Sequence, residues 1–298
     1  MPNRIKGLWA AAFFILFAST SPSVTRYAVI RTLTVYDLMV MRSAIGALIF
    51  FPYLIAVRKH LSLKVLSIGF LMSALQGWGV NLMVICGMQY APSGHISALG
   101  PGVSPMWVML VGYILNNKIP SKNQVISSSV LLLGAIFLLL GSGFLYSDLW
   151  LLLGDSLFLL SSFTSAFYIV YMERREISPM LGAALISFFS GIVVVPMFFI
   201  FHFPTAMDQA SNFELTYQGV YQGFFIGVLI FFLIGYSISN IGSSLFVSLS
   251  ASIPLISMII GHFMNGDEFR AWDIFSICLV TCGLLLGISR TDLKKPQT

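Results

Sequence analysis

Ten apolar stretches of membrane-spanning length divide this chain, and they constrain its fold more than any other feature of the sequence. A transmembrane α-helix needs about 20 predominantly apolar residues. Stretches that meet this requirement, numbered spans 1 to 10 in chain order, lie at residues 7–25, 36–57, 65–87, 92–115, 123–141, 149–171, 180–201, 218–238, 242–264 and 272–289. The sequence therefore predicts an all-α membrane protein with ten transmembrane helices.

The amino-acid composition is that of a membrane protein. Hydrophobic residues make up 57% of the 298 and charged residues 9%, whereas charged residues account for roughly 25% of soluble domains. Apart from Arg42, the Lys and Arg residues lie in short segments outside the spans, so the net charge of +5 does not indicate a nucleic-acid partner. Cys86, Cys278 and Cys282 lie in apolar runs without a His at ligand spacing. We expect buried, unreactive thiols, and neither a metal nor a cofactor.

The two halves of the chain repeat each other at an offset of 149 residues. Laying 105–134 over 254–283 aligns Pro105 with Pro254, Met109 with Met258, Gly112 with Gly261, Asn116 with Asn265, Ser127 with Ser276 and Gly134 with Gly283. Prolines and glycines that fall in step within membrane-length segments indicate a duplication, with one copy in 1–145 and the other in 146–298. If each copy has five spans, the second copy enters the bilayer in the opposite orientation. Many transporters use such inverted repeats for alternating access.

The distribution of charge predicts which connections face the cytoplasm. With both termini cytoplasmic, the inside segments contain twelve of the 16 basic residues. These are Arg4, Lys6, Arg58, Lys59, Lys64, Lys118, Lys122, Arg174, Arg175, Arg290, Lys294 and Lys295. The outside connections contain only Arg31 and Arg270 beside six acidic residues. This asymmetry follows the positive-inside rule, and we expect a multi-pass protein of a bacterial inner membrane.

Several segments resemble the EamA branch of the drug/metabolite transporter superfamily. They are DLMVMRSAIGALIFFP in span 2, APSGHISALGPGVSPMW in span 4 and LLLGDSLFLLSSFTSAFYIVYMERR from span 6 onward. The second copy also has the family's mid-span proline followed by a Gly-Glu-like turn at 266–268 (GDE). The first copy departs from this pattern at 116–118 (NNK), which we expect to affect packing or topology more than substrate choice. The resemblance covers essentially the whole chain and implies a transporter whose central cavity is lined by spans 1, 3, 4, 6, 8 and 9.

Two arginines are candidate binding groups for an anionic substrate. Arg42 lies about seven residues into span 2, and Arg26 closes span 1. A charge near the middle of a span costs about 3 kcal/mol on insertion scales, so such a residue usually faces a cavity or a partner. A guanidinium can hold a carboxylate in a bidentate fork. The structural alternatives are that Arg42 caps backbone carbonyls or pairs with Asp37, and that Arg26 extends to the outer membrane surface.

Prolines and small hydroxyl residues predict which helices bend. Pro22 stands among five Ser and Thr residues of span 1, and the duplicated spans 4 and 9 contain Pro101, Pro105 and Pro254. A proline frees backbone carbonyls, which are satisfied only where protein or a wet cavity covers the helix. Ser248 belongs to a serine stripe in span 9 and is a candidate substrate contact. Close packing of small residues between helices explains these hydroxyls equally well.

Larger polar and aromatic side chains complete the predicted substrate site. They are Gln76, Trp78 and Asn81 in span 3, His95 in span 4, and Phe163 and Tyr168 in span 6. A Trp can stack on a planar or apolar substrate, and an imidazole both donates and accepts hydrogen bonds. The alternatives are a core or lipid-facing Trp78, and a His95 satisfied by a backbone carbonyl.

Asp155 in span 6 is the candidate for energy coupling, because the other carboxylates inside predicted spans, Asp37 and Asp273, lie at the starts of spans 2 and 10. It could carry a proton, or it could be a structural helix cap. Without a deeper acidic group, facilitated diffusion or exchange is an equal alternative to proton coupling. The chain has no G-x-x-x-x-G-K-[ST] motif, so ATP coupling within it, or an evident ATPase subunit, is not expected.

The predicted function is secondary transport of small organic metabolites, amino acids or related carboxylated compounds, by alternating access and in the direction of export. Import or exchange of a nucleoside-like or cationic metabolite is the alternative. A membrane-embedded lipid or prenyl transferase is disfavoured, because the sequence lacks an Asp-rich motif and an H-E-x-x-H motif. We expect no enzymatic activity, and a small-molecule substrate and the lipid bilayer as the partners.

Overall fold

The computed structural model describes residues 2–117, 119–142, 147–172, 178–241 and 243–287, and these residues form helices and short connections without a strand. The first half contains α1 (Pro2–Arg31), α2 (Val35–Ala56), α3 (Leu63–Met72), η2 (Ser73–Gly77), α4 (Trp78–Gly87), α5 (Ser93–Ser97), η3 (Ala98–Gly102), α6 (Ser104–Asn116) and α7 (Lys122–Leu140). The second half contains α8 (Leu149–Met172), α9 (Pro179–Ile200), α10 (Asn212–Gln218), η6 (Gly219–Leu229), α11 (Ile230–Ile241), α12 (Ser243–Ser250), α13 (Ile253–Asn265) and α14 (Ala271–Leu286). The short 3-10 helices η1 (Arg58–His60) and η5 (Met207–Gln209) lie in connections.

Within the residues that the structure describes, eight helical segments are long and apolar enough to cross a membrane, and α13 and α14 are shorter apolar helices. The helices follow the predicted spans closely, although α1 extends beyond both predicted ends of span 1. Many large apolar side chains point outward, such as Leu48 and Phe263, which are 72% and 82% exposed. Lipid can cover such a surface. The expectation of buried thiols is wrong for Cys278 and Cys282, which are exposed on α14.

Segments of π-helical geometry interrupt longer helical rods in the part of the chain that the structure describes. They are η2 between α3 and α4, η3 between α5 and α6, and η6 between α10 and α11. In η3 the cause is local, because Pro101 cannot donate a backbone hydrogen bond. A π-turn frees backbone groups and rotates the following side chains, and such turns are frequent at functional sites.

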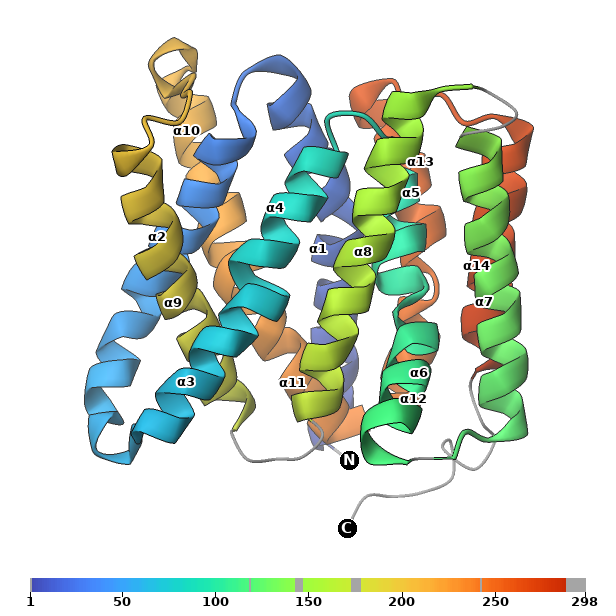
Figure 1. Cartoon of the computed structure of the whole chain (residues 1–298), viewed down its shortest axis with the longest axis horizontal. Helices are drawn as coiled ribbons and strands as arrows, with labels where there is room; N and C mark the ends of the chain where they lie inside the picture. Colours follow the sequence, from blue (N-terminus) through green and yellow to red (C-terminus); the bar gives the residue numbers. More distant parts are fainter. Residues whose placement is uncertain (1, 118, 143–146, 173–177, 242, 288–298) are drawn as a thin grey trace.

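The duplicated helices α6 and α13 have the same length and the same ends, shifted by 149 residues. Each has a proline in its first turn, Pro105 or Pro254. Each ends at a left-handed residue, Asn117 with φ of 50° and Gly266 with φ of 72°. Figure 1 shows α5 above α6 but α12 below α13, so the two helices run in opposite directions.

The contact between α7 and α14 repeats under the same shift. A Cβ atom on Gly134 would lie 2.7 Å from Val280, and one on Gly283 would lie 2.8 Å from Leu131. Under the 149-residue offset Gly134 corresponds to Gly283, and Leu131 corresponds to Val280. Each contact is therefore the repeat equivalent of the other. Since later residues of α7 meet earlier residues of α14, the two helices are antiparallel. Their backbones approach closely because the glycines lack side chains.

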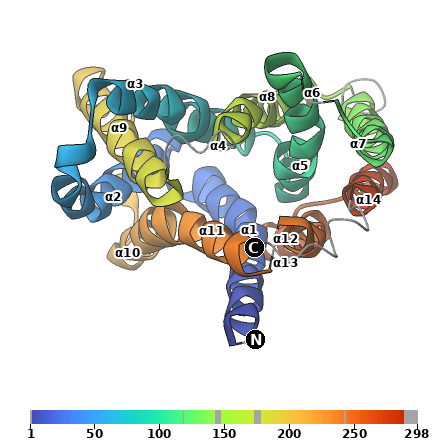
Figure 2. The ribbon, with the colours of Figure 1, turned by 90° about the horizontal axis from the view of Figure 1, so that it is seen from below.

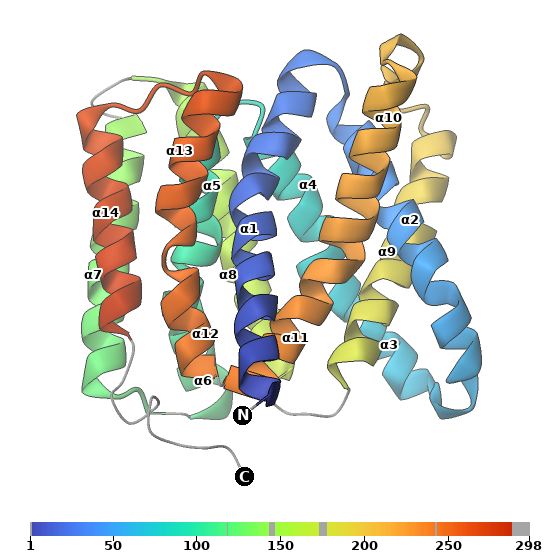
Figure 3. The ribbon, with the colours of Figure 1, turned by 180° about the vertical axis from the view of Figure 1, so that it is seen from behind.

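Figures 1 to 3 show the arrangement around α1. Helices α2, α3, α9 and α10 lie on one side of the molecule, and α7 and α14 close the opposite side (Figures 1 and 2). Helix α1 runs between α11 and the α12–α13 rod (Figure 3). The start of α1 and the last turn of α14 lie at the same end of the bundle (Figure 1). We call this end the terminal end and the other the distal end.

Candidate functional site

Arg42 occupies the centre of a buried polar cluster between α1, α2, α4 and η6. Its Nη1 donates to Asn81 Oδ1 at 2.8 Å, and its Nη2 donates to Gln222 Oε1 and, at 3.5 Å, to Thr25 Oγ1. Gln222 Nε2 in turn donates to Thr25 Oγ1 and to Gln218 Oε1. All these partners are neutral. The guanidinium therefore has hydrogen bonds but no carboxylate among its described partners.

A cavity of about 240 Å³ lies beside this cluster. It is lined from α2, the η2–α4 rod, α9 and the η6–α11 rod. Four buried polar atoms of the lining have no hydrogen-bond partner among the described residues: Arg42 Nε, Ser43 Oγ, Gln76 Oε1 and Ser190 Oγ. Each buried polar group without a partner costs roughly 1–3 kcal/mol. Their concentration around one cavity is the arrangement expected where a polar ligand binds.

Backbone geometry at η2 opens this cavity. Gly77 lies at the end of the π-helical segment, and a Cβ atom on it would overlap Ser190 Oγ and lie 3.0 Å from Ile186 Cγ2. The glycine thus allows η2 to approach α9 closely. Gln76 lies within this π-helical segment and Asn81 follows it in α4, and both residues line the cavity.

The structure contradicts the alternative that Arg42 pairs with Asp37. Asp37 closes the capping box at the start of α2, where its Oδ2 accepts from Thr34 N at 2.9 Å. The Asp37 carboxylate also accepts hydrogen bonds from the 205–206 connection. Thr205 Oγ1 donates to Oδ1 at 2.7 Å, and Ala206 N donates to Oδ2 at 3.0 Å. Asp37 therefore orders a distal connection and leaves Arg42 without a countercharge.

Arg26 lies outside the Arg42 cavity and bridges three segments at the distal end. Its Nε lies 3.0 Å from Asp267 Oδ1, and its Nη1 donates to the carbonyl oxygens of Met88 and Ala91. Asp267 Oδ2 also accepts from Ser93 N at 2.9 Å. Arg26 therefore joins α1, the turn before α5 and the turn after α13, and its partners are already supplied by the protein.

His95 and Asp155 are brought together, which neither prediction included. His95 Nδ1 lies 2.8 Å from Asp155 Oδ1, and both side chains are fully buried. The alternative of a backbone carbonyl partner for His95 is therefore wrong. Asp155 is bonded to the side chains of His95 and Ser142 instead of capping a helix.

A second, apolar cavity of about 340 Å³ lies among the predicted bending prolines Pro101, Pro105 and Pro254. Its lining comes from α1, the α5–η3–α6 rod, α8, the α12–α13 rod and α14. Spans 1, 4, 6 and 9 of the expected central cavity thus meet here, and spans 1, 3 and 8 meet at Arg42. Pro22 lies inside α1 and does not line either cavity.

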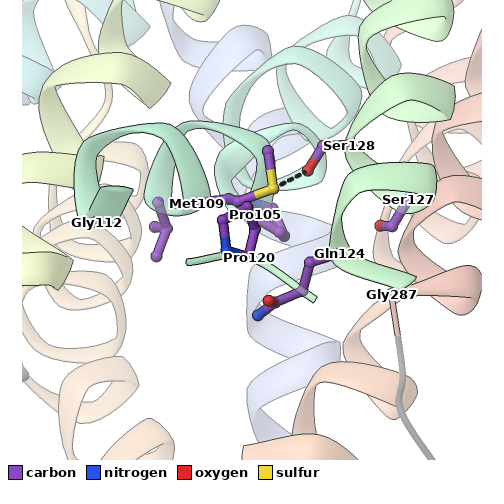
Figure 4. Close-up of a pocket in the computed structure, with 9 residues that line it drawn as sticks. Pro105, Met109, Gly112, Pro120, Gln124, Ser127, Ser128 and Gly287 are labelled. Atoms are coloured by element: carbon purple, nitrogen blue, oxygen red, sulfur yellow. Dashed lines mark hydrogen bonds between the residues drawn. The ribbon is translucent and has the colours of Figure 1, made fainter. Parts of the chain in front are cut away.

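A smaller pocket of about 180 Å³ adjoins the apolar cavity at Pro105 and lies between α6, α7 and the end of α14. In Figure 4 the side chains of Met109 and Ser128 point toward one another, and Ser128 Oγ donates a hydrogen bond of 3.3 Å to Met109 Sδ. Pro120 and Gln124 belong to the α6–α7 connection and the first turn of α7 (Figure 4). The pocket contains no charged side chain among its lining residues.

The aromatic candidates do not converge on Arg42. Trp78 lines a separate apolar pocket with Tyr36 and Phe198. Phe163 packs edge-on against Trp107 and Phe167, and Tyr168 lines an outer apolar pocket. The side chain of Ser248 lies outside the described residues. Of the predicted binding residues, only Arg42, Gln76 and Asn81 share one cavity.

Sequence reasoning missed Gln218, Gln222, Ser43 and Ser190. The two glutamines stand four residues apart in span 8, so they share one face of a helix, and this spacing was a usable signal. Ser43 adjoins Arg42 in sequence. Ser190 gave no comparable signal, because only the packing of α9 against η2 brings it to the cavity.

Comparison with known proteins identifies the family. The profile described as "EamA-like transporter family" matches residues 5–140 and again residues 152–289. The chain belongs to the EamA-like transporter family. The predicted resemblance is thereby confirmed, and the two matches cover both copies of the repeat. Multi-pass insertion in a membrane follows from this family and from the apolar helices.

A solved structure supports the same fold for this EamA-like protein. It is described only as "Crystal structure of protein", is 15% identical and superposes with a TM-score of 0.63. The match covers 98% of this chain and 100% of the other. At this identity the likeness concerns the fold alone. A search of the curated proteins found no match.

Proposed function

We propose that this EamA-like protein is a ten-span secondary transporter that moves small carboxylated metabolites, with aliphatic amino acids as the substrate class. Its two five-helix repeats, 1–145 and 146–298, would be inverted in a bacterial inner membrane with both termini cytoplasmic, and export is the proposed direction. The carboxylate binds at Arg42, and the aliphatic side chain occupies the adjoining cavity.

The observation that carries this proposal is a buried guanidinium without a countercharge. Arg42 is only 9% exposed and lies inside a membrane-crossing helix, yet its described partners are two amides and one hydroxyl. A desolvated charge is costly unless an opposite charge compensates it. A substrate carboxylate would supply that charge, and the unpartnered Arg42 Nε offers one arm of the fork.

The remaining lining supports a small, partly apolar substrate. Apart from the polar groups near Arg42, the cavity is lined by aliphatic residues such as Val80, Ile186 and Ile230. Its volume of about 240 Å³ is below the roughly 300–1,000 Å³ of pockets for drug-sized ligands. Leucine and related amino acids combine one carboxylate with a compact aliphatic body, and they match both properties.

The two ends of the bundle differ in a way that suits alternating access. Arg26 and Asp267 join three segments at the distal end. The apolar cavity instead includes Ile169 and Phe246, which lie near the terminal-end boundaries of α8 and α12. The antiparallel glycine contacts of α7 and α14 exchange under the repeat, which supports a two-fold relation in the membrane plane.

A thermal-shift screen of the detergent-purified protein tests the substrate class. A ligand that binds only the folded state raises apparent stability by RT ln(1 + [L]/Kd). We expect L-leucine to raise the melting temperature and leucinamide, which lacks the carboxylate, to have no effect. Arg42→Ala should abolish the shift, and Arg31→Ala, an exposed arginine stacked on Tyr27, should preserve it. A shift with nucleosides or organic cations alone would refute the proposal in favour of those substrates.

A further inference from the structure

A second buried polar cluster, distinct from the Arg42 site, lies between α5, α8 and α14. His95 is fully buried, with its Nδ1 2.8 Å from Asp155 Oδ1 and its Nε2 3.8 Å from Asp273 Oδ1. The imidazole, from the first half of the chain, thus stands between two carboxylates from α8 and α14 of the second half. The first contact is a hydrogen bond, whereas the second is too long for one.

The second contact is incomplete in a specific way. His95 Nε2 and Asp273 Oδ1 are both buried without a hydrogen-bond partner among the described residues. If a neutral imidazole donates its Nδ1 proton to Asp155, Nε2 has only a lone pair. Two acceptors then face each other across 3.8 Å. If Nε2 of His95 gains a proton, it becomes a donor that faces the acceptor Oδ1 of Asp273.

Ser142 offers a place for a further proton at Asp155. Its Oγ lies 3.1 Å from Leu138 O and within hydrogen-bond distance of Asp155 Oδ2. A hydroxyl has one hydrogen, so it can donate to only one of these acceptors. When it donates to Leu138 O, a proton on Asp155 Oδ2 completes the other hydrogen bond. The cluster therefore has two hydrogen-bond patterns that differ by protons.

The charges facing the cluster favour proton uptake. Among the ion pairs of the described residues, Asp155 and Asp273 contact only His95, and the nearby Arg26 pairs with Asp267 on the turn after α13. The start of α14 offsets part of the charge on Asp273, whose Oδ2 accepts from Arg270 N at 3.0 Å. Protonation of His95 would give both carboxylates a positive partner.

We propose that His95, Asp155 and Asp273 form a proton-binding site that couples transport to proton movement. Proton binding stands on the geometry of the cluster alone, whereas the coupling rests on the proposed transport function. Protons would enter from the distal end when the segments held by Arg26 separate.

Helix α1 provides the physical link between this site and the Arg42 cavity. Two consecutive residues of α1 face different clusters: Thr25 contacts Arg42 and Gln222, and Arg26 pairs with Asp267. Asp267 Oδ2 accepts from Ser93 N, two residues before His95 on α5. Movement of α1 at one cluster therefore displaces partners at the other. A protonated His95 would draw Asp273 toward α5 and alter the packing of α14 beside the Asp267 turn.

Infrared difference spectroscopy of the purified full-length protein tests proton binding. Exposed carboxyl groups stay ionised between about pH 6 and 8, so a carboxylic-acid signal in that range comes from a perturbed group. We expect a carboxyl signal that His95→Gln abolishes, together with the His95 contribution to the imidazole signal, and we expect Asp155→Asn and Asp273→Asn each to alter the carboxyl signal. Asp208→Asn, at an exposed position in η5, should leave them unchanged. If the parent and His95→Gln give the same spectrum, the proton site is refuted.

Proteoliposomes loaded with a pH-sensitive dye test the coupling. An imposed L-leucine gradient should move protons in the parent, whereas His95→Gln should exchange leucine without moving protons. Proton movement that persists unchanged in His95→Gln and Asp273→Asn would overturn the coupling. If no variant exchanges leucine while the infrared signals behave as expected, the substrate class is wrong and the proton site stands.

Discussion

The Arg42 cluster and the His95 cluster are both buried in apolar surroundings, but they treat charge in opposite ways. Around Arg42 a single positive charge meets neutral partners beside a cavity with several unpartnered polar atoms. Around His95 the carboxylates of Asp155 and Asp273 enclose an imidazole, and none of the described cavities is lined by these residues. The Arg42 cluster therefore has an uncompensated charge and a cavity that can hold a solute. The His95 cluster has no such cavity among the described residues, and only its number of bound protons can change.

The largest expected effect is a loss of stability when the ion pair between Arg26 and Asp267 at the distal end is broken. Asp267→Asn removes the countercharge of Arg26, and breaking a buried ion pair by removing one partner costs roughly 3–5 kcal/mol. Because Arg26 keeps its carbonyl partners, we expect the lower limit, about 3 kcal/mol. Thermal unfolding in detergent should show a large fall in melting temperature. Asp208→Asn is the matched exposed control, and equal melting temperatures for the two variants would contradict a structural role for the pair.

The second expected effect supplies Arg42 with an internal countercharge. Asn81 Oδ1 already accepts from Arg42 Nη1 at 2.8 Å, so Asn81→Asp places a carboxylate there. The pair should stabilise the protein by about 2 kcal/mol and should lower leucine affinity by about tenfold, since the substrate must compete for the guanidinium. Asn212→Asp, in the exposed first turn of α10, controls for added charge. Unchanged leucine affinity in Asn81→Asp would show that the carboxylate binds elsewhere.

The smallest expected effect concerns the shape of the cavity. Gly77→Ala introduces a Cβ that overlaps Ser190 Oγ, so we expect a loss of leucine affinity of about fivefold, or ~1 kcal/mol. Ser190→Ala in the same chain removes the overlapping atom and should restore part of the affinity, although Ile186 stays close. Isothermal titration of both variants measures this. If the double variant binds leucine no more tightly than Gly77→Ala does, the contact between residue 77 and Ser190 does not determine leucine affinity.

The sequence predicted the helices well because membrane burial leaves a strong local signal. Span length, proline position and the 149-residue offset are all properties of contiguous segments, and the ends of α6 and α13 reproduce that offset. Arg42, Gln76 and Asn81 were also predictable, since large polar groups are conspicuous in apolar helices.

The partners of these groups were not predictable. Gln222 and Ser190 reach Arg42 and its cavity only through the packing of η6 and α9 against α2 and η2. The pairing of His95 with Asp155 and Asp273 joins positions 60 or more residues apart, and no periodicity in the chain encodes such distances. Trp78 lines a different pocket from Arg42, and its sequence position at the start of α4 did not indicate which pocket it would face.

The most direct test of the central claim is counterflow of radiolabelled L-leucine into leucine-loaded proteoliposomes, with Arg42→Met compared to the parent. Met fills similar volume without charge, and replacing a poorly compensated buried charge by an apolar side chain is often neutral or stabilising. The account predicts that Arg42→Met unfolds at the same or a higher temperature but no longer accumulates leucine. Leucine counterflow at the parental rate in Arg42→Met would contradict the assignment of Arg42 as the carboxylate-binding residue.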